Sequence, residues 1–216
     1  MSLAVDELAG LAPVIPVVVL DDAEDAVPLA RALVAGGLPV IEVTLRTPAA
    51  LAAIEHIAAE VPDAVVGAGT VTSADQVVRS LGAGARFLVS PGSTPALLDA
   101  FEASAAPFLP GASTASEVLA LTERGIGVAK LFPAEAVGGI ATLKALSGPF
   151  AGMRFCPTGG IDRDKAAGYL ALDNVVCVGG SWMVPPAAIR AGDWATIQAL
   201  ASDAAALRGA PALTAS

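Results

Sequence analysis

Histidine and cysteine are scarce in this sequence, and their scarcity argues against a metal site. The 216 residues include one histidine, His56, and two cysteines, Cys156 and Cys177. Neither a CxxC nor an HxxxH spacing occurs, so no metal is expected. In a reducing compartment the two cysteines are expected to be small buried apolar residues and not a disulfide. His56 lies in a segment of helical character and is expected to be a surface or partly buried residue, not a catalytic base.

Long apolar runs and positive charge are also missing. The densest apolar stretch, residues 14–20, is seven residues long and contains a proline, so no segment is predicted to span a membrane. The amino-terminal M-S-L-A-V-D-E-L has neither the basic flank nor the apolar core of a signal peptide, which predicts a cytoplasmic protein. The net charge of −9 argues against nucleic acid and anionic membranes as partners, because both require a basic face. A small anionic substrate would need local positive potential from a few side chains or backbone N–H groups.

Eight short runs of β-branched and apolar residues alternate with segments of helical periodicity. Helix starts are marked by Thr94 followed by Pro95, and by a capping box formed by Thr114 and Glu117. A repeated order of strand then helix implies parallel pairing through right-handed crossovers. The starts of the runs are 19 to 27 residues apart, and the runs occupy residues 13–20, 40–45, 65–70, 87–91, 108–112, 127–133, 154–160 and 174–180.

Eight strand–helix units are the number found in an α/β fold of the (β/α)8 TIM barrel type. We predict one such barrel domain over residues 1–216, with a short helix in V-D-E-L-A-G-L that closes its bottom and a frayed tail at 208–216. A doubly wound open sheet is the alternative, and the missing G-x-G-x-x-G after the first run disfavours it. In a barrel, chemistry is expected at the carboxyl-terminal ends of the strands.

Lys130 stands out because it lies within the apolar run G-V-A-K-L-F-P. The other two lysines, Lys144 and Lys165, lie in segments that resemble the surfaces of amphipathic helices. Strand alternation places Val128, Lys130 and Phe132 on one face of the predicted strand. Such apolar neighbours favour the uncharged amine, which is the form that attacks a carbonyl carbon to make a Schiff base.

A carboxylate occupies a similar position in an earlier strand. The run V-I-E-V-T-L-R-T places Glu42, Thr44 and Arg46 on one face by the same alternation. If Glu42 and Lys130 both face the barrel interior, they converge. From the charge pattern alone, a structural salt bridge and a catalytic pair are equally good interpretations.

The last two runs end in paired glycines. The seventh ends P-T-G-G-I-D and the eighth ends V-G-G-S-W. In barrels, the loops after these strands often bind phosphate through glycine N–H groups and a helix N-terminus. Thr158 and Ser181 would add hydroxyl donors, so the sequence predicts a phosphate site there.

Together these motifs resemble the KDPG/KHG aldolase family, in which KDPG is 2-keto-3-deoxy-6-phosphogluconate and KHG is 4-hydroxy-2-oxoglutarate. The resemblance covers residues 10–207 and is carried by E-V-T-L-R-T, G-A-G-T-V, V-S-P-G, F-L-P-G, V-A-K-L-F-P-A-E, F-C-P-T-G-G-I and C-V-G-G-S-W. It implies a class I aldolase built on a (β/α)8 barrel and assembled as a homotrimer. The family often has two aromatic residues after the lysine, and Leu131, which replaces the first, is expected to face away from the site.

The resemblance also implies a role for each matching residue. It makes Lys130 the Schiff-base lysine and Glu42 the general acid and base. It assigns the pyruvate carboxylate to Arg46 and Thr70, and the walls of the pyruvyl pocket to Pro91 and Phe132. It assigns the sugar-acid chain to Thr158, and the phosphate to Gly159, Gly160, Gly180 and Ser181.

The implied activity is a lyase reaction that cleaves KDPG to pyruvate and D-glyceraldehyde 3-phosphate. It would require no cofactor beyond the covalent Schiff base on Lys130, and its partner would be a 2-keto-3-deoxy sugar acid phosphate. Cleavage of KHG or of the galactonate epimer of KDPG are the nearest alternatives. A metal-dependent aldolase or a phosphosugar isomerase on the same barrel is disfavoured by the shortage of metal ligands. A non-catalytic barrel that serves as an assembly subunit is a further alternative.

Overall fold

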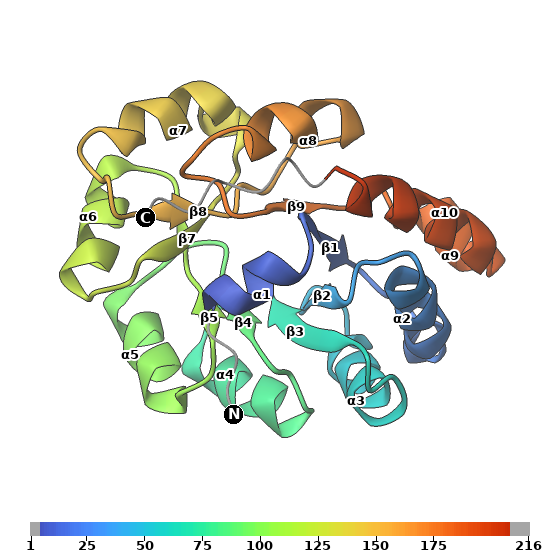
Figure 1. Ribbon diagram of the computed structural model, residues 1–216. Coiled ribbons are helices and arrows are strands. Elements are labelled where there is room, and N and C mark those ends of the chain that lie inside the picture. The colour runs from blue at the N-terminus through green and yellow to red at the C-terminus, as the bar shows by residue number, and fades with distance from the viewer. Residues whose placement is uncertain (1–4, 208–216) are drawn as a thin grey trace.

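Strands and helices alternate along the chain in the computed structural model, which describes residues 5–207 (Figure 1). The strands are β1 (Val14–Val18), β2 (Val40–Thr44), β3 (Val65–Gly69), β4 (Leu88–Val89), β5 (Phe108–Leu109), β6 (Gly111–Ala112), β7 (Val128–Leu131), β8 (Arg154–Phe155) and β9 (Val178–Gly180). The α-helices are α1 (Val5–Leu11), α2 (Ala26–Ala35), α3 (Ala50–Glu60), α4 (Ala74–Gly82), α5 (Pro95–Ser104), α6 (Ala115–Glu123), α7 (Gly139–Ser147), α8 (Arg163–Leu170), α9 (Pro186–Ala191) and α10 (Trp194–Ala205). Two short 3-10 helices, η1 (Ala23–Asp25) and η2 (Glu135–Val137), precede α2 and α7.

All strand pairs in the structure are parallel, as the alternation of elements predicts. Six strands form one sheet in the order β5-β4-β3-β2-β1-β9, and three form a second sheet in the order β6-β7-β8. Isolated parallel bridges link Phe155 to Val175 and Thr158 to Gly179, between the segments of β8 and β9. Figure 1 shows the strands at the centre of the molecule and α2 to α8 with α10 around them.

Several predicted strands are shorter than the sequence runs that indicated them. The run at 108–112 is split into β5 and β6 by Pro110, which has no N–H to give to a neighbouring strand. The run at 154–160 keeps only β8, because it continues into a proline and into Gly159 and Gly160, whose φ angles are +106° and +78°. The run at 174–180 forms a regular strand only over Val178–Gly180. These boundaries correct the prediction but leave the order of the elements unchanged.

Alternation along each strand divides the buried residues into two layers. Ile41 and Val43 of β2, and Ala129 and Leu131 of β7, pack in the large cluster beneath the helices. Val40 and Val128, on the opposite faces of the same strands, belong to a second cluster between the strands of the two sheets. Leu131 therefore faces away from the interior, as predicted.

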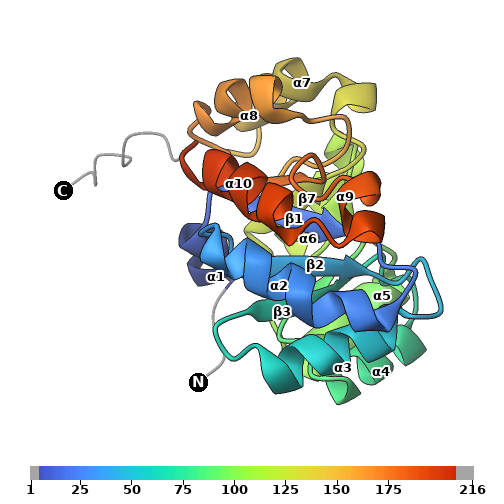
Figure 2. The ribbon, with the colours of Figure 1, turned by 90° about the vertical axis from the view of Figure 1, so that its right-hand side faces the viewer.

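Helix α1 covers the amino-terminal ends of the strands (Figure 2). Its Leu8 and Ala9 are buried and pack against the inner cluster, which includes Ile15 and Val40 near the starts of their strands. The predicted amino-terminal helix is thus confirmed at the bottom of the molecule. Residues 208–216, where a frayed tail was predicted, lie outside the described residues.

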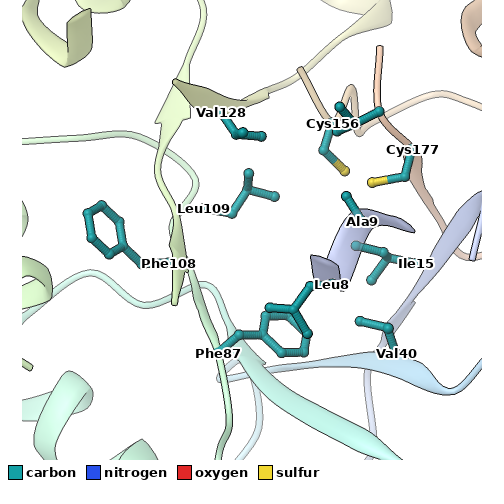
Figure 3. Close-up of a pocket in the computed structure, with 11 residues that line it drawn as sticks. Leu8, Ala9, Ile15, Val40, Phe87, Phe108, Leu109, Val128, Cys156 and Cys177 are labelled. Atoms are coloured by element: carbon teal, nitrogen blue, oxygen red, sulfur yellow. The ribbon is translucent and has the colours of Figure 1, made fainter. Parts of the chain in front are cut away.

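A small apolar cavity lies within this inner cluster (Figure 3). It encloses about 20 Å³, and its walls carry no charged side chain, so it adds no polar chemistry to this end. Cys156 and Cys177 line it, and their sulfur atoms point toward each other. Both cysteines are free and buried, which confirms the prediction. The side chain of Cys156 and burial raise the pKa of the Cys177 thiol, so this thiol is held in its protonated form.

The helix start signals are confirmed where the sequence marks them. The Thr94 hydroxyl accepts a hydrogen bond from the Leu97 N–H, and Pro95 is the first residue of α5. Thr114 and Glu117 form a complete capping box at the start of α6. Local sequence therefore fixes where these strand-to-helix loops end. Between residues 5 and 207, no helix is both long enough and apolar enough to cross a membrane.

Candidate active site

Lys130 and Glu42 form a buried ion pair between the two sheets. The Lys130 Nζ lies 3.0 Å from Glu42 Oε1 and 3.3 Å from Oε2. The two residues are 5% and 3% exposed, and they come from β7 and β2, which belong to different sheets. The pair confirms that both strands turn these side chains inward, and it joins positions 88 residues apart in the sequence.

This pair lies on the carboxyl-terminal side of the inner apolar cluster. Lys130 is the third residue of β7 and Glu42 the third of β2, so each follows a residue of the inner apolar cluster, Val128 or Val40. Removing two charges from water is costly unless they are paired, and here each charge is the other's partner. At 3.0 Å the carboxylate is also close enough to take a proton from the ammonium and to return it.

An aromatic ring borders the ion pair. Phe132 follows β7 and is half-buried, and the Lys130 Nζ lies 5.5 Å from the centre of its ring. The Phe132–Pro133 peptide bond is cis. The ring supplies an apolar wall and a favourable cation–π contact beside the amine, which fits the predicted place of Phe132 in a pyruvyl pocket.

The predicted carboxylate-binding residues lie just beyond β2 and β3. Arg46 lies in the turn after β2 and is exposed, two residues past the buried Thr44, whose hydroxyl donates to the Val18 carbonyl at 2.9 Å. Thr70 follows β3 directly and adopts a left-handed conformation with φ of +60°. A threonine in this region is strained, and such strain is concentrated at functional positions.

Pro91 lies close to the strand that pairs with the lysine strand. It follows β4 and is half-buried. Gly111 of β6 pairs with Lys130, and a side chain at Gly111 would overlap the Pro91 backbone. The absence of a side chain at Gly111 therefore lets the loop carrying Pro91 approach the strand next to the lysine.

The first of the two predicted phosphate loops follows β8 and contains three of the predicted residues. Thr158 is buried, Gly159 is half-buried and Gly160 is exposed. Both glycines have left-handed φ angles, which bring successive backbone N–H groups into an arrangement that favours anions. A Cβ on Gly159 would lie 3.4 Å from the Phe132 ring, so this loop adjoins the residue beside the lysine.

The second predicted phosphate loop begins at the end of β9. Gly180 is buried and ends the strand, and Ser181 is exposed immediately after it. A side chain at Gly180 would overlap the indole of Trp182, and one at Gly179 would overlap Thr158. The paired glycines thus allow two neighbouring side chains to pack, in addition to any contact they make with a ligand.

The family is decided by comparison with known sequences. A model of the family described as KDPG and KHG aldolase matches residues 5–200. The chain belongs to the KDPG and KHG aldolase family. The resemblance drawn from the sequence motifs is thereby confirmed.

Individual aldolases of known sequence and structure are closely similar. The 2-dehydro-3-deoxy-phosphogluconate aldolase of Dickeya dadantii is 51% identical over 201 residues, which cover 93% of this chain and 94% of the relative. A crystal structure of the KDPG aldolase from Legionella pneumophila, with pyruvate captured as a covalent carbinolamine, has a TM-score of 0.91 and 47% identity and covers 93% of this chain and 97% of that one. The Zymomonas mobilis enzyme with 3-phosphoglycerate has a TM-score of 0.89 and 49% identity and covers 95% and 96% of the two chains.

The other histidine and lysine side chains considered in the sequence lie apart from the ion pair of Lys130 and Glu42. His56 belongs to α3, and its Nδ1 lies 3.3 Å from the Ala23 carbonyl oxygen. Lys144 and Lys165 are exposed on α7 and α8, as predicted. Across residues 5–207, no three or more His, Cys, Asp or Glu side chains are grouped so as to hold a metal ion.

Gly69 is a residue that the sequence did not mark as functional. It ends β3, and a methyl group at this position would overlap the carboxylate and Cγ of Glu42. The missing side chain therefore leaves the space in which the Glu42 carboxylate meets Lys130. The run G-A-G-T contained the signal, because a glycine inside a strand marks a close approach.

We expect a Gly69→Ala variant of this aldolase to fold and to lose most of its activity. The added methyl group displaces the Glu42 carboxylate, and a shift of about 1 Å in a catalytic group costs about 10²-fold in rate. Steady-state release of pyruvate measures the loss. Gly82→Ala in α4 is the matched control, because a Cβ there meets nothing within 4 Å. Equal activity in both variants would contradict the role given to Gly69.

Proposed function

We propose that this protein is a class I aldolase that cleaves KDPG to pyruvate and D-glyceraldehyde 3-phosphate, with Lys130 as the Schiff-base residue. The observation that carries the proposal is the buried pair of Lys130 and Glu42, 3.0 Å apart. A buried amine beside a carboxylate provides both the nucleophile and the proton carrier that such a reaction requires. Family membership supports the same chemistry.

The reaction begins at the C2 ketone of the substrate. Glu42 takes a proton from the Lys130 ammonium, and the free amine attacks C2 to form a carbinolamine. Glu42 gives its proton to the departing hydroxyl, and loss of water leaves an iminium and an ionised Glu42. The positive nitrogen of the iminium draws electrons from the neighbouring C3–C4 bond. The iminium therefore serves as the electron sink for cleavage, and no metal is needed.

Glu42 then carries one proton from the C4 hydroxyl to C3. As the C3–C4 bond breaks, the C4 hydroxyl loses its proton to Glu42, directly or through a water molecule, and glyceraldehyde 3-phosphate leaves. The enamine that remains on Lys130 takes the proton back at C3. Hydrolysis of the resulting iminium releases pyruvate and restores the amine.

The residues around the pair would hold the two ends of the substrate. Arg46 and Thr70 would bind the pyruvate carboxylate, and Pro91 and Phe132 would line the pyruvyl pocket. At the far end Thr158 would contact the sugar-acid chain. The phosphate would be bound by Gly159, Gly160, Gly180 and Ser181. The family resemblance implies these assignments, and the positions of the residues near the ends of β2, β3, β4, β7, β8 and β9 support them.

The larger architecture belongs to the same proposal. We infer that the two parallel sheets are parts of one (β/α)8 barrel in a single domain. The bridges between the β8 and β9 segments support this closure, and so does the single proline that separates β5 from β6. A cytoplasmic homotrimer that acts on a 2-keto-3-deoxy sugar acid phosphate completes the proposal.

A comparison of substrates tests the proposed specificity. We expect the highest kcat/KM for KDPG. KHG should give a lower value because it has no phosphate for the two glycine loops to bind. The galactonate epimer should give a lower value because its sugar-acid chain, which Thr158 would contact, has a different configuration. Coupled oxidation of NADH by lactate dehydrogenase measures pyruvate release for all three. A higher kcat/KM for KHG than for KDPG would make the protein a KHG aldolase, which is the second activity in the description of the family. Failure to cleave any of the three would overturn the proposal in favour of a non-catalytic barrel.

A further inference from the structure

The loop after β7 holds the glycine loop after β8 through its backbone. The Ala134 N–H donates to the Thr158 carbonyl at 2.8 Å, and the Glu135 N–H donates to the Gly159 carbonyl at 3.1 Å. Ala134 is buried and Glu135 begins the short helix η2, only five residues after Lys130. The lysine strand and the predicted phosphate loop are therefore joined by two successive hydrogen bonds.

A side chain from α8 forms a hydrogen bond with the next carbonyl of the glycine loop, that of Gly160. The Lys165 Nζ donates to the Gly160 carbonyl at 2.9 Å and pairs with Glu135 Oε2 at 2.9 Å. Tyr169, one turn further along α8 and 1% exposed, donates its hydroxyl hydrogen to Glu135 Oε1. Each oxygen of the Glu135 carboxylate thus has a partner on α8.

The orientation of three backbone N–H groups follows from these contacts. Because a peptide unit is planar and trans, its N–H points opposite to its C=O. The carbonyls of residues 158–160 are held on the side of Glu135, so the N–H groups of Gly159, Gly160 and Ile161 are directed to the other side. The Gly159 N–H faces the Gly179 carbonyl across the isolated parallel bridge of Thr158 and Gly179. Within residues 5–207 the N–H groups of Gly160 and Ile161 have no hydrogen-bond partner. They form a set of free donors at the start of α8, which is an arrangement suited to an anion.

The packing around Glu135 leaves little freedom for the loop. A Cβ on Gly160 would lie 2.8 Å from Cβ and Cγ of Glu135, and a side chain at Gly139 would overlap the Tyr169 hydroxyl. Glycine is therefore required at both positions for the glycine loop, η2 and α8 to approach each other. The hydrogen bonds from Tyr169 and Lys165 lower the pKa of Glu135, and Glu135 in turn raises the pKa of Lys165, so both groups stay charged at neutral pH.

We propose that Lys165, acting with Glu135 and Tyr169, positions the N–H groups of Gly160 and Ile161 to bind the phosphate of the substrate. The inference rests on the proposed function. Lys165 is a positioning residue in this account, because its Nζ contacts the Gly160 carbonyl and not the substrate. Because the Lys165–Glu135 pair is largely exposed, removing it should barely change stability, and its effect should fall on phosphate binding.

The test compares one reaction that uses the phosphate with one that does not. In Lys165→Met, which keeps the stem and loses the charge, KM for KDPG is expected to rise about tenfold with kcat nearly unchanged, since a hydrogen bond from a charged donor is lost. The pyruvate concentration that gives half-maximal inactivation by borohydride should stay the same, because pyruvate carries no phosphate. Tyr169→Phe should raise KM for KDPG by a smaller factor. Lys144→Met, which removes a similar exposed charge from α7, should match the unmodified protein in both measurements.

The outcomes separate this inference from the proposed function. An unchanged KM for KDPG in Lys165→Met would overturn the positioning role and leave the aldolase assignment intact. So would an equal rise in KM for KDPG and in the pyruvate concentration that gives half-maximal inactivation. If the unmodified protein neither cleaves KDPG nor is inactivated with pyruvate, the proposed function itself has failed. A fall in melting temperature with no selective rise in KM would also overturn the inference, because it would mean that Lys165 serves only stability.

Discussion

Replacing Lys130 by methionine is expected to reduce the release of pyruvate from KDPG by at least about 10⁴-fold, since the covalent step has no other nucleophile. Lys130 is the buried lysine, 5% exposed, whereas Lys144 and Lys165 are exposed on helices. Steady-state kinetics with the lactate dehydrogenase assay measures the loss. Lys144→Met is the matched control, and it should keep full activity.

The stability of this variant requires its own control, because the change leaves the Glu42 carboxylate buried without its cation. Removing one partner of a buried ion pair typically costs about 3–5 kcal/mol. The double variant Lys130→Met/Glu42→Gln leaves no unpaired charge, so it should recover much of this stability and remain inactive. Activity in a well-folded double variant would show that the pair is structural and that the chemistry lies elsewhere.

Replacing Glu42 by glutamine is expected to lower kcat by about 10²–10⁴-fold. Lys130 should still form its adduct with pyruvate, but more slowly, because water must take the ammonium proton in place of the carboxylate. Glutamine keeps the shape of the side chain and its contact with the lysine, but it does not carry the proton between the C4 hydroxyl and C3. Exchange of the pyruvate methyl protons in D2O, followed by NMR, isolates this step because it involves neither phosphate nor aldehyde.

Two results would contradict the role given to Glu42. If methyl-proton exchange in Glu42→Gln equals that of the unmodified protein, another group carries the proton. If the variant forms the pyruvate adduct as fast as the unmodified protein, Glu42 does not take the proton from the Lys130 ammonium. The rate of methyl-proton exchange in Gly69→Ala should lie between the rates of the unmodified protein and of Glu42→Gln, because this variant keeps the Glu42 carboxylate but displaces it.

The order of the elements and the inward direction of the central pair could be predicted from sequence. Period-two alternation in V-A-K-L and V-I-E-V-T fixes which side chains share a face, and that face is the one buried inside the strands. The capping box of Thr114 and Glu117 could also be predicted, because it depends on two residues only three positions apart in the sequence. Local rules are reliable where the interaction is itself local.

The interactions that position the site could not be predicted, because they join residues distant in sequence. Gly69 makes room for a carboxylate 27 positions earlier, and the Glu135 carboxylate meets α8 residues 30 and 34 positions later. The glycine at position 69 indicates a close approach, but no periodicity or spacing in the sequence identifies the partner in either case. The interruption of a strand at Pro110 and the early end of β8 also depend on which neighbouring strand needs each N–H group.

Borohydride reduction in the presence of pyruvate tests the central claim most directly. The account predicts that the protein loses activity as it gains one carboxyethyl group, and that peptide mass spectrometry finds this group on Lys130 within G-V-A-K-L-F-P. Lys144 and Lys165 should stay unmodified, and Lys130→Met should gain no group. An adduct on another lysine, or a carboxyethyl group gained by the Lys130→Met variant under the same treatment, would contradict the account.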